Sequence, residues 1–182
     1  MPAVRLQLKL TLVDAKPLIW RRLLVTNQIS LKRIHESLQA VAGWNDTHQH
    51  EFIIGEKRYG QPALGEVVPV ENEALFRLHS LPLTRGTSFT YVHDFGDHWK
   101  IEVTVEQVLP PDPTAPFALL IEGARAFPPE DSGGVAEYDN LLAALSDPTN
   151  PEHDECRQWA GEDFEPEHLD LGAENERLRT LE

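Results

Sequence analysis

Three stretches of the chain alternate apolar and polar residues, and this alternation constrains the fold more than any other feature. Residues 4–12 place Val or Leu at every second position, with Arg, Gln, Lys and Thr between them. Residues 87–93 and 98–108 repeat the pattern on either side of the sequence DFGD. In a β-strand alternate side chains point to the same face, so an apolar residue at every second position gives one apolar face. These stretches therefore predict antiparallel strands, with a hairpin tip at DFGD.

Helical periodicity occupies fewer segments. Ser30 can cap a helix that continues to about Ala42 and ends at Gly43. After residue 134 apolar residues recur at helical spacing, and further helices are expected at 151–159 and near the end of the chain. The sequence therefore predicts an α+β fold: an antiparallel β-sheet built from hairpins, with one N-terminal helix and C-terminal helices packed on it. We expect one domain over residues 1–182, in which 1–125 are mainly sheet plus one helix and 126–182 form an acidic helical part.

Composition narrows the cellular setting. A chain of 182 residues can bury a core of its own, and its single cysteine excludes a disulfide framework. The first residues lack the apolar run of a signal peptide, and no stretch is long enough to cross a membrane. These observations predict a cytoplasmic protein that does not act at a membrane.

The formal net charge of −14 is unevenly distributed. Residues 1–42 hold seven Lys/Arg against two Asp/Glu, whereas residues 126–182 hold three against sixteen. An acidic protein repels phosphate backbones, which argues against nucleic acid as a partner. The favoured interpretation is that the two regions neutralise each other, either inside one fold or across a dimer. The alternative is nucleic-acid contact through the N-terminal cations Arg21, Arg22, Lys32 and Arg33.

Histidines and aspartates are concentrated at two predicted strand ends. Asp94 and Asp97 flank the hairpin tip, and His98 follows it. His48 and His50 are two apart, so in a strand both imidazoles face the same side. If the hairpins are neighbours, His48, His50, Asp94, Asp97 and His98 could bind a divalent metal such as zinc, manganese or iron. The structural alternative is a turn in which the aspartates accept backbone N–H groups and Gly96 supplies a positive φ.

Other candidate binding residues lie outside this tip. Glu130 and Asp131 precede Gly133 and Gly134, and a Gly-rich turn ahead of a helix could bind an anion. The adjacent carboxylates oppose this, so a rigid turn into a helix is the favoured interpretation. Trp44 and Trp99 are either packing anchors or part of a binding surface, together with Arg21 and Arg22. The chain shows no activated serine or cysteine nucleophile. Ser132 has neighbouring acids and no evident base, and Cys156 directly follows Asp154 and Glu155, which disfavour its thiolate.

Several blocks resemble the plasmid pRiA4b ORF-3-like family. They are PLIWRRLLV, IHESLQAVAGWNDTHQHEF, YVHDFGDHWKIEVTVE, PPEDSGG and DPTNPEHDECRQWAGEDFEPEHLDL, in the expected order. The resemblance implies an α+β fold, an uncharacterised function and an association with mobile elements, sometimes under a resolvase-like label. It also implies cysteines on either side of PPED, where this chain has Phe127 and Ser132.

Three functions are consistent with the sequence. The first is a binding or accessory module with a protein partner, since no cofactor loop or catalytic signature is present. The second is a metal-dependent enzyme that uses the histidine and aspartate residues. The third is a DNA-associated protein of a mobile element.

Overall fold

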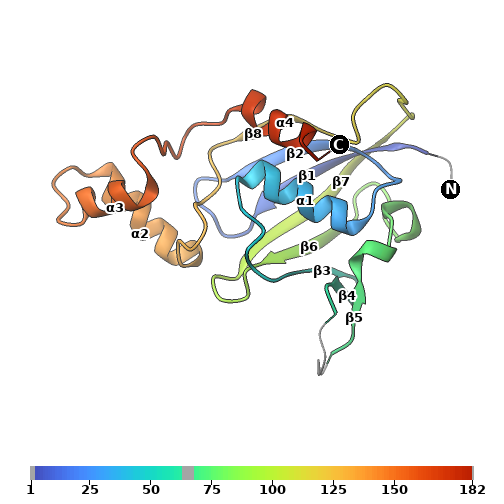
Figure 1. Ribbon diagram of the computed structural model, residues 1–182, viewed down its shortest axis with the longest axis horizontal. Helices are drawn as coiled ribbons and strands as arrows, with labels where there is room; N and C mark the ends of the chain where they lie inside the picture. The colour runs from blue at the N-terminus through green and yellow to red at the C-terminus, as the bar shows by residue number, and fades with distance from the viewer. Residues whose placement is uncertain (1–2, 63–67, 182) are drawn as a thin grey trace.

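Eight strands form one sheet in the computed structural model, which describes residues 3–62 and 68–181 (Figure 1). The strand order is β5-β4-β3-β6-β7-β1-β2-β8, and every neighbouring pair is antiparallel except β4 and β5. The strands are β1 (Arg5–Leu12), β2 (Trp20–Thr26), β3 (His50–Ile54), β4 (Lys57–Gly60), β5 (Val70–Asn72), β6 (Ser88–His93), β7 (Trp99–Leu109) and β8 (Ala118–Ala124). The helices are α1 (Leu31–Ala42), α2 (Gly134–Ser146), α3 (His153–Ala160) and α4 (Leu171–Arg179), with 3₁₀ turns at Glu73–Leu75 and Leu78–Ser80.

The predicted alternation gives the sheet one apolar and one polar face. Leu8, Leu10 and Leu12 of β1 are fully buried, while the residues between them are partly exposed. Helix α1 lies across the apolar face, and α4 packs beside it against β8 (Figure 1). The α+β prediction is therefore confirmed, although the first helix follows two strands rather than opening the chain.

The predicted limits of α1 are also confirmed. The hydroxyl of Ser30 accepts the backbone N–H of Arg33, and Gly43 ends the helix in the left-handed region with a φ of 75°. A cap of this kind stabilises a helix by about 1 kcal/mol. These two ends fix which side of α1 faces the sheet, and that side carries the polar residues His35 and Gln39 into the interior.

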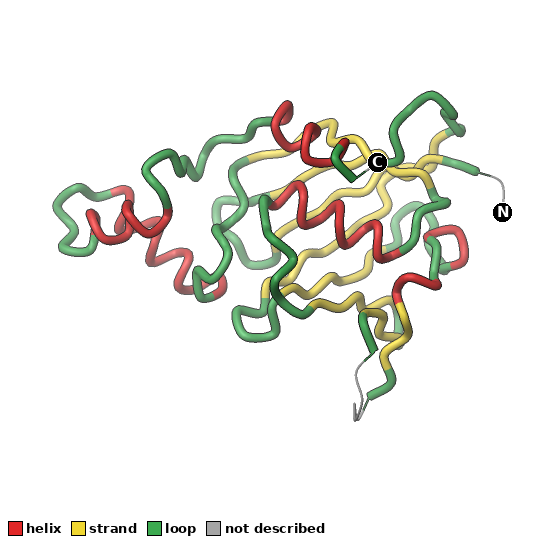
Figure 2. The backbone as a smooth tube through the Cα atoms, viewed as in Figure 1, coloured by secondary structure: helices red, strands yellow, loops and turns green. Residues whose placement is uncertain are grey.

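Helices α2 and α3 form where the sequence predicts them, but they do not cover a face of the sheet. Both extend beyond the end of the sheet, on the side of the β6–β7 turn (Figure 2). Helix α2 contacts the core at its beginning, where Tyr138 packs edge-on against Trp99. Within residues 3–62 and 68–181, no helix has the length and apolar character needed to cross a membrane.

Candidate functional site

The DFGD turn between β6 and β7 depends on an aspartate. The Asp94 carboxylate accepts the backbone N–H groups of Gly96 (2.8 Å) and Asp97 (3.3 Å). The positive φ angles of the turn belong to Asp94 (56°) and His98 (59°), and not to Gly96 as the sequence suggests. Asp tolerates the left-handed region because its short side chain can bond to nearby backbone, as it does here.

The second aspartate of the turn holds a distant loop. Asp97 accepts the backbone N–H of Gly133 at 2.9 Å. Gly134, with a φ of 79°, passes so close to the turn that a Cβ atom would lie 2.6 Å from the Asp97 carbonyl oxygen. The Gly-Gly pair is therefore required where the PPEDSGG loop docks on the DFGD turn.

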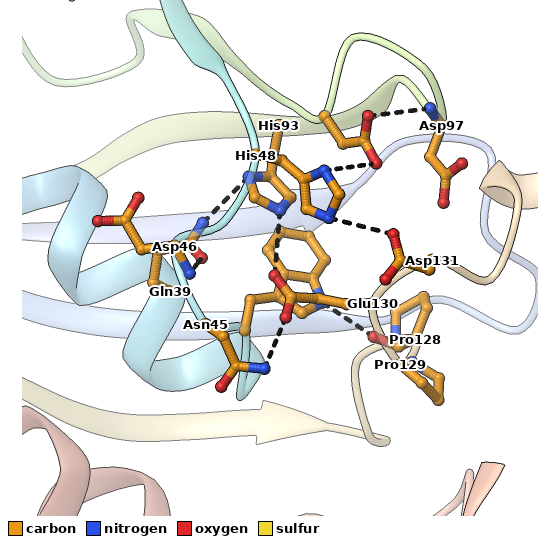
Figure 3. Close-up of polar contacts among 12 residues, drawn as sticks. Gln39, Asn45, Asp46, His48, His93, Asp97, Pro128, Pro129, Glu130 and Asp131 are labelled. Atoms are coloured by element: carbon orange, nitrogen blue, oxygen red, sulfur yellow. Dashed lines mark hydrogen bonds and ion pairs between the residues drawn. The ribbon is translucent and has the colours of Figure 1, made fainter. Parts of the chain in front are cut away.

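The same loop is fastened to the segment that follows α1. The Trp44 indole N–H donates to the Pro128 carbonyl oxygen (2.9 Å), and the Asn45 side-chain amide donates to Oε2 of Glu130 (2.8 Å; Figure 3). Trp44 and Trp99 are both buried, at 6% and 1% exposure. Trp99 therefore belongs to the core, whereas Trp44 forms one wall of the site.

His48 lies where these three segments meet (Figure 3). Its Nδ1 is 3.4 Å from the Asp94 carboxylate, and its Nε2 is 3.1 Å from the Asp131 carboxylate. Ligand atoms from the three residues all lie within 4.8 Å of one another, which is compact enough to surround one metal ion. Asp131, like Asp94, has a positive φ (60°), and strained backbone of this kind concentrates at functional sites.

His93 lies beside His48, with the two rings edge to face and their centroids 5.7 Å apart. It stacks on Trp44 at 4.4 Å and accepts or donates a hydrogen bond at Nδ1 with Gln39. Its Nε2 is buried without a hydrogen-bond partner, 3.7 Å from Oε1 of Glu130, which is also buried and unpartnered. Burial, followed by the nearby His48, lowers the pKa of His93 to about 4.

His50 belongs to a separate buried cluster. Its ring stacks on His35 with centroids 3.4 Å apart and planes 4° apart, and its Nε2 is 2.9 Å from the Glu73 carboxylate. His35 contacts the Tyr91 hydroxyl and Asp46. Ring nitrogens coordinate metals in the ring plane, so two parallel stacked imidazoles cannot both direct lone pairs at one ion. The structure therefore does not arrange His35 and His50 as a shared metal site.

The residues predicted as one metal site thus divide into different environments. His48 and Asp94 come together as expected, and Asp131, predicted only as a binding residue, joins them. His50 points into the buried histidine cluster, because β3 begins at His50 and His48 lies in the bend before it. Asp97 is engaged with Gly133, and His98 is exposed.

Sequence reasoning missed the polar interior around Gln39 and overlooked Glu73. The spacing of four between His35 and Gln39, on the inner side of α1, was an available signal. His35 itself is buried and hydrogen-bonded, as expected for a histidine on an apolar face.

The cations predicted to contact nucleic acid are paired with carboxylates. Arg21 is 1% exposed and forms a two-bond pair with Glu174 of α4, so it is not a surface residue. Arg22 contacts Glu106 and Glu122 on the polar face of the sheet. Lys32 and Arg33 both pair with Glu36. The Arg21–Glu174 pair links the basic and acidic regions inside one fold.

An open pocket of about 450 Å³ adjoins His48. Asp46, His50, Arg58 and the exposed Phe95 contribute to its walls. A small ligand could therefore approach His48 from solvent.

The sequence profile described as plasmid pRiA4b ORF-3-like protein matches residues 4–173. The chain belongs to this family. It is 35% identical over 163 residues to the uncharacterized protein y4hQ of Sinorhizobium fredii (strain NBRC 101917 / NGR234), covering 88% of this chain and 83% of that protein. The crystal structure of MM3350, a protein of unknown function from Methanosarcina mazei Go1, superposes with a TM-score of 0.84 at 32% identity, covering 93% of this chain and 96% of that one.

Two positions of this pRiA4b ORF-3-like protein depart from the pattern expected of the family. Phe127, in the first cysteine position, is buried edge-on against Trp44 with the Arg21 guanidinium over its ring. Ser132, in the second, donates its hydroxyl to the Pro129 carbonyl oxygen. Both residues hold the PPED loop by packing and hydrogen bonding.

Proposed function

We propose that the protein functions through a divalent metal ion bound by His48, Asp94 and Asp131. The observation that carries the proposal is the convergence of these three ligands from three separate segments, within 4.8 Å of one another. One imidazole and two carboxylates suit zinc, manganese or iron(II). Three protein ligands leave a coordination position for water or substrate, which is the arrangement of a catalytic centre rather than a structural one.

The surroundings support an open rather than a closed site. His48 is 27% exposed and borders the 450 Å³ pocket, and the Asp131 side chain is 71% exposed. Asp94 and Asp131 both have a positive φ, and their carboxylates lie 3.4 Å and 3.1 Å from the ring nitrogens of His48. The competing explanation is an ion pair in which a protonated His48 bridges the two carboxylates with no metal.

Calorimetric titration of the metal-free protein with zinc chloride, and separately with manganese chloride, tests the proposal. We expect one ion per chain and a thermal midpoint that rises on binding. His48→Ala and Asp94→Asn should abolish binding. His168→Ala, a change at an exposed histidine elsewhere, should bind as the wild type does. Titrations that show no saturable binding, or equal binding by His48→Ala, would favour the ion pair.

His98→Ala distinguishes this ligand set from the wider one suggested by the sequence. His98 is close to Asp94 in the chain but exposed. Its removal should leave zinc stoichiometry and affinity unchanged. A large loss of affinity would bring His98 back into the site.

A non-enzymatic binding function is the second candidate, and Trp159 favours it. This tryptophan is 49% exposed on α3 and borders a groove of about 320 Å³ between α2 and α3. Glu137 and Glu152 line the same groove, so a partner with a basic segment would suit it. Loss of a captured partner on Trp159→Ala, with zinc binding intact, would assign partner binding to this groove.

A further inference from the structure

Arg5 is a buried cation without a carboxylate partner. Among residues 3–62 and 68–181, three arginines are less than a tenth exposed, namely Arg5 (6%), Arg21 and Arg125. The other two are paired with carboxylates, Glu174 for Arg21 and Glu167 for Arg125. Arg5 forms no ion pair with any described residue. Since burial of an unpaired charge is unfavourable, the position of Arg5 indicates that its counter-ion comes from outside the chain.

The hydrogen bonds of Arg5 leave most of its guanidinium unused. A guanidinium carries five N–H groups, and here one of them, on Nη2, donates to the Leu24 carbonyl oxygen at 3.0 Å. Nε is buried without a partner. Nη1 also has no partner among the described residues, but it is not enclosed as Nε is. Nη1 is therefore the part of the guanidinium that a ligand can reach.

Arg5 lines a pocket of about 300 Å³ under the loop that joins β7 to β8. Three prolines of residues 110–117, together with Phe117, make most of the pocket wall apolar. The backbone N–H of Thr26 donates to the Phe117 carbonyl oxygen at 3.0 Å, which fastens this end of the loop to β2. A cavity of this volume is at the small end of the range for ligand pockets, so it suits a compact molecule.

This pocket is remote from the proposed metal ligands. Arg5 opens β1 and pairs with Leu109, the last residue of β7. The DFGD turn precedes Trp99, the first residue of the same strand, so the two places lie at opposite ends of β7 (Figure 1). A strand of this length separates them by roughly 30 Å. A ligand beside Arg5 is thus independent of any ion at His48.

The charges that line the pocket favour a ligand with one negative charge. Arg5 is the one cation among the lining residues, and Asp112 is the one acid. Asp112 is exposed, and its carboxylate accepts the backbone N–H and the hydroxyl of Thr114, so it is engaged elsewhere. A guanidinium matches a carboxylate in shape and charge. A phosphate dianion would meet a single cation and the repulsion of Asp112.

We propose that this pocket binds a small apolar monocarboxylate. The carboxylate accepts hydrogen bonds from Nη1 of Arg5, and the apolar body packs against the prolines of residues 110–117 and the ring of Phe117. The ligand supplies the negative charge that the chain provides to Arg21 and Arg125 but not to Arg5. This assignment does not depend on the proposed metal function.

Calorimetric titration with sodium benzoate and with sodium hexanoate tests the proposal. We expect one acid per chain for at least one of them. Benzamide, which has the shape of benzoate without its charge, should bind at least about 10-fold more weakly, as should benzoate to Arg5→Met. Arg85→Met is the control, since Arg85 is exposed and bonds a backbone carbonyl oxygen, and it should keep the wild-type affinity. Failure of both acids to bind the wild type, or equal affinity in Arg5→Met, overturns the inference.

Thermal unfolding of Arg5→Met shows whether the buried charge is already satisfied inside the protein. Without ligand, the variant should unfold at or above the wild-type midpoint, because it removes a buried cation that lacks a partner. Benzoate or hexanoate at saturation should raise the wild-type midpoint and leave that of Arg5→Met unchanged. A variant that unfolds far below the wild type, or fails to fold, overturns the inference, because Arg5 would then be stabilised by the chain itself.

Asp112→Asn separates a site for anions from a site for cations. The asparagine side-chain oxygen can still accept from Thr114, while the negative charge beside the pocket is lost. This variant should bind the acid at least as tightly as the wild type does, and inorganic phosphate at equal ionic strength should not displace the acid. Weaker binding by Asp112→Asn, or displacement by phosphate, would contradict a pocket for a monocarboxylate.

Discussion

His35 and His50 stack face to face in the interior, with ring centroids 3.4 Å apart and planes within 4° of each other. Two protonated imidazoles at this separation would repel strongly in a medium of low polarity. Burial is the first cause that lowers the pKa of His35, and the neighbouring His50 is the second. The stack therefore stays stable only while at least one of the rings is neutral.

We expect acid to destabilise the metal-free protein through the buried histidines. The pKa of His93 is about 4 when folded and 6.5 when unfolded, so between these values the unfolded chain binds the extra proton. The stabilising contribution is complete above pH 6.5 and is lost as pH falls toward 4. For His93 the difference corresponds to about 3 kcal/mol. Urea unfolding at several pH values, with chelator present, measures the slope.

His93→Phe isolates this contribution from the titration of the many carboxylates. The variant should lose less stability than the wild type between pH 7 and pH 5. His168→Phe, at an exposed position, should keep the wild-type slope. Equal slopes in His93→Phe and wild type would show that His93 does not govern the acid response.

Replacing Gln39, which is only 4% exposed, should lower the free energy of unfolding substantially. Gln39→Leu preserves side-chain volume but leaves the Asp46 N–H and Nδ1 of His93 without their partners. Each buried polar group left unpaired costs about 1–3 kcal/mol, so a total loss of about 2–4 kcal/mol is expected. Gln158→Leu, at an exposed position of α3, should change the free energy of unfolding by less than about 0.5 kcal/mol. A loss below 1 kcal/mol in Gln39→Leu would mean that water replaces the amide.

Local sequence patterns were sufficient to predict the strands over residues 4–12, 87–93 and 98–108, the caps of α1 and the hairpin around DFGD, but they did not predict β5. Alternation identifies which side chains share a face, and Ser30 and Gly43 act on backbone groups within a few residues of themselves. These relationships depend on neighbouring residues alone. The predicted family membership is likewise confirmed. It could be predicted from sequence because the family's motifs are contiguous blocks of residues.

The site itself depends on contacts between distant segments, which spacing does not determine. Asp97 bonds to Gly133, thirty-six residues away, and that contact brings Asp131 to His48. The sequence alone predicts Arg21 to be a surface cation. It is instead buried in β2, where it pairs with the carboxylate of Glu174, 153 residues later in the chain. Spacing predicted that His48 and Asp94 could meet, but it could not predict which element would complete their surroundings.

The docking of the PPEDSGG loop on the DFGD turn can be tested by adding one methyl group. Gly134→Ala introduces a Cβ 2.6 Å from the Asp97 carbonyl oxygen at a φ of 79°. Gly43→Ala is matched, because its φ is 75° and its Cβ would meet nothing within 4 Å. Both variants bear the cost of a left-handed alanine, so Gly134→Ala should be at least about 2 kcal/mol less stable than Gly43→Ala. Denaturant unfolding of both variants measures the difference, and equal losses would show that the loop yields without strain.

The buried pair that joins α4 to the sheet should show opposite effects for single and double substitution. Glu174→Leu leaves the Arg21 guanidinium buried without its carboxylate, at a cost of about 3–5 kcal/mol. Arg21→Met combined with Glu174→Leu should recover most of that loss, because two apolar side chains can fill the same space. The exposed pair Arg179–Glu176 is the control, and Glu176→Leu should cost less than about 1 kcal/mol. Urea unfolding of all variants gives the coupling energy. Arg21 also donates to the carbonyl oxygens of Trp20 and Ala124, so a double variant as unstable as Glu174→Leu alone would indicate that these backbone bonds, rather than the ion pair, hold the edge of the sheet.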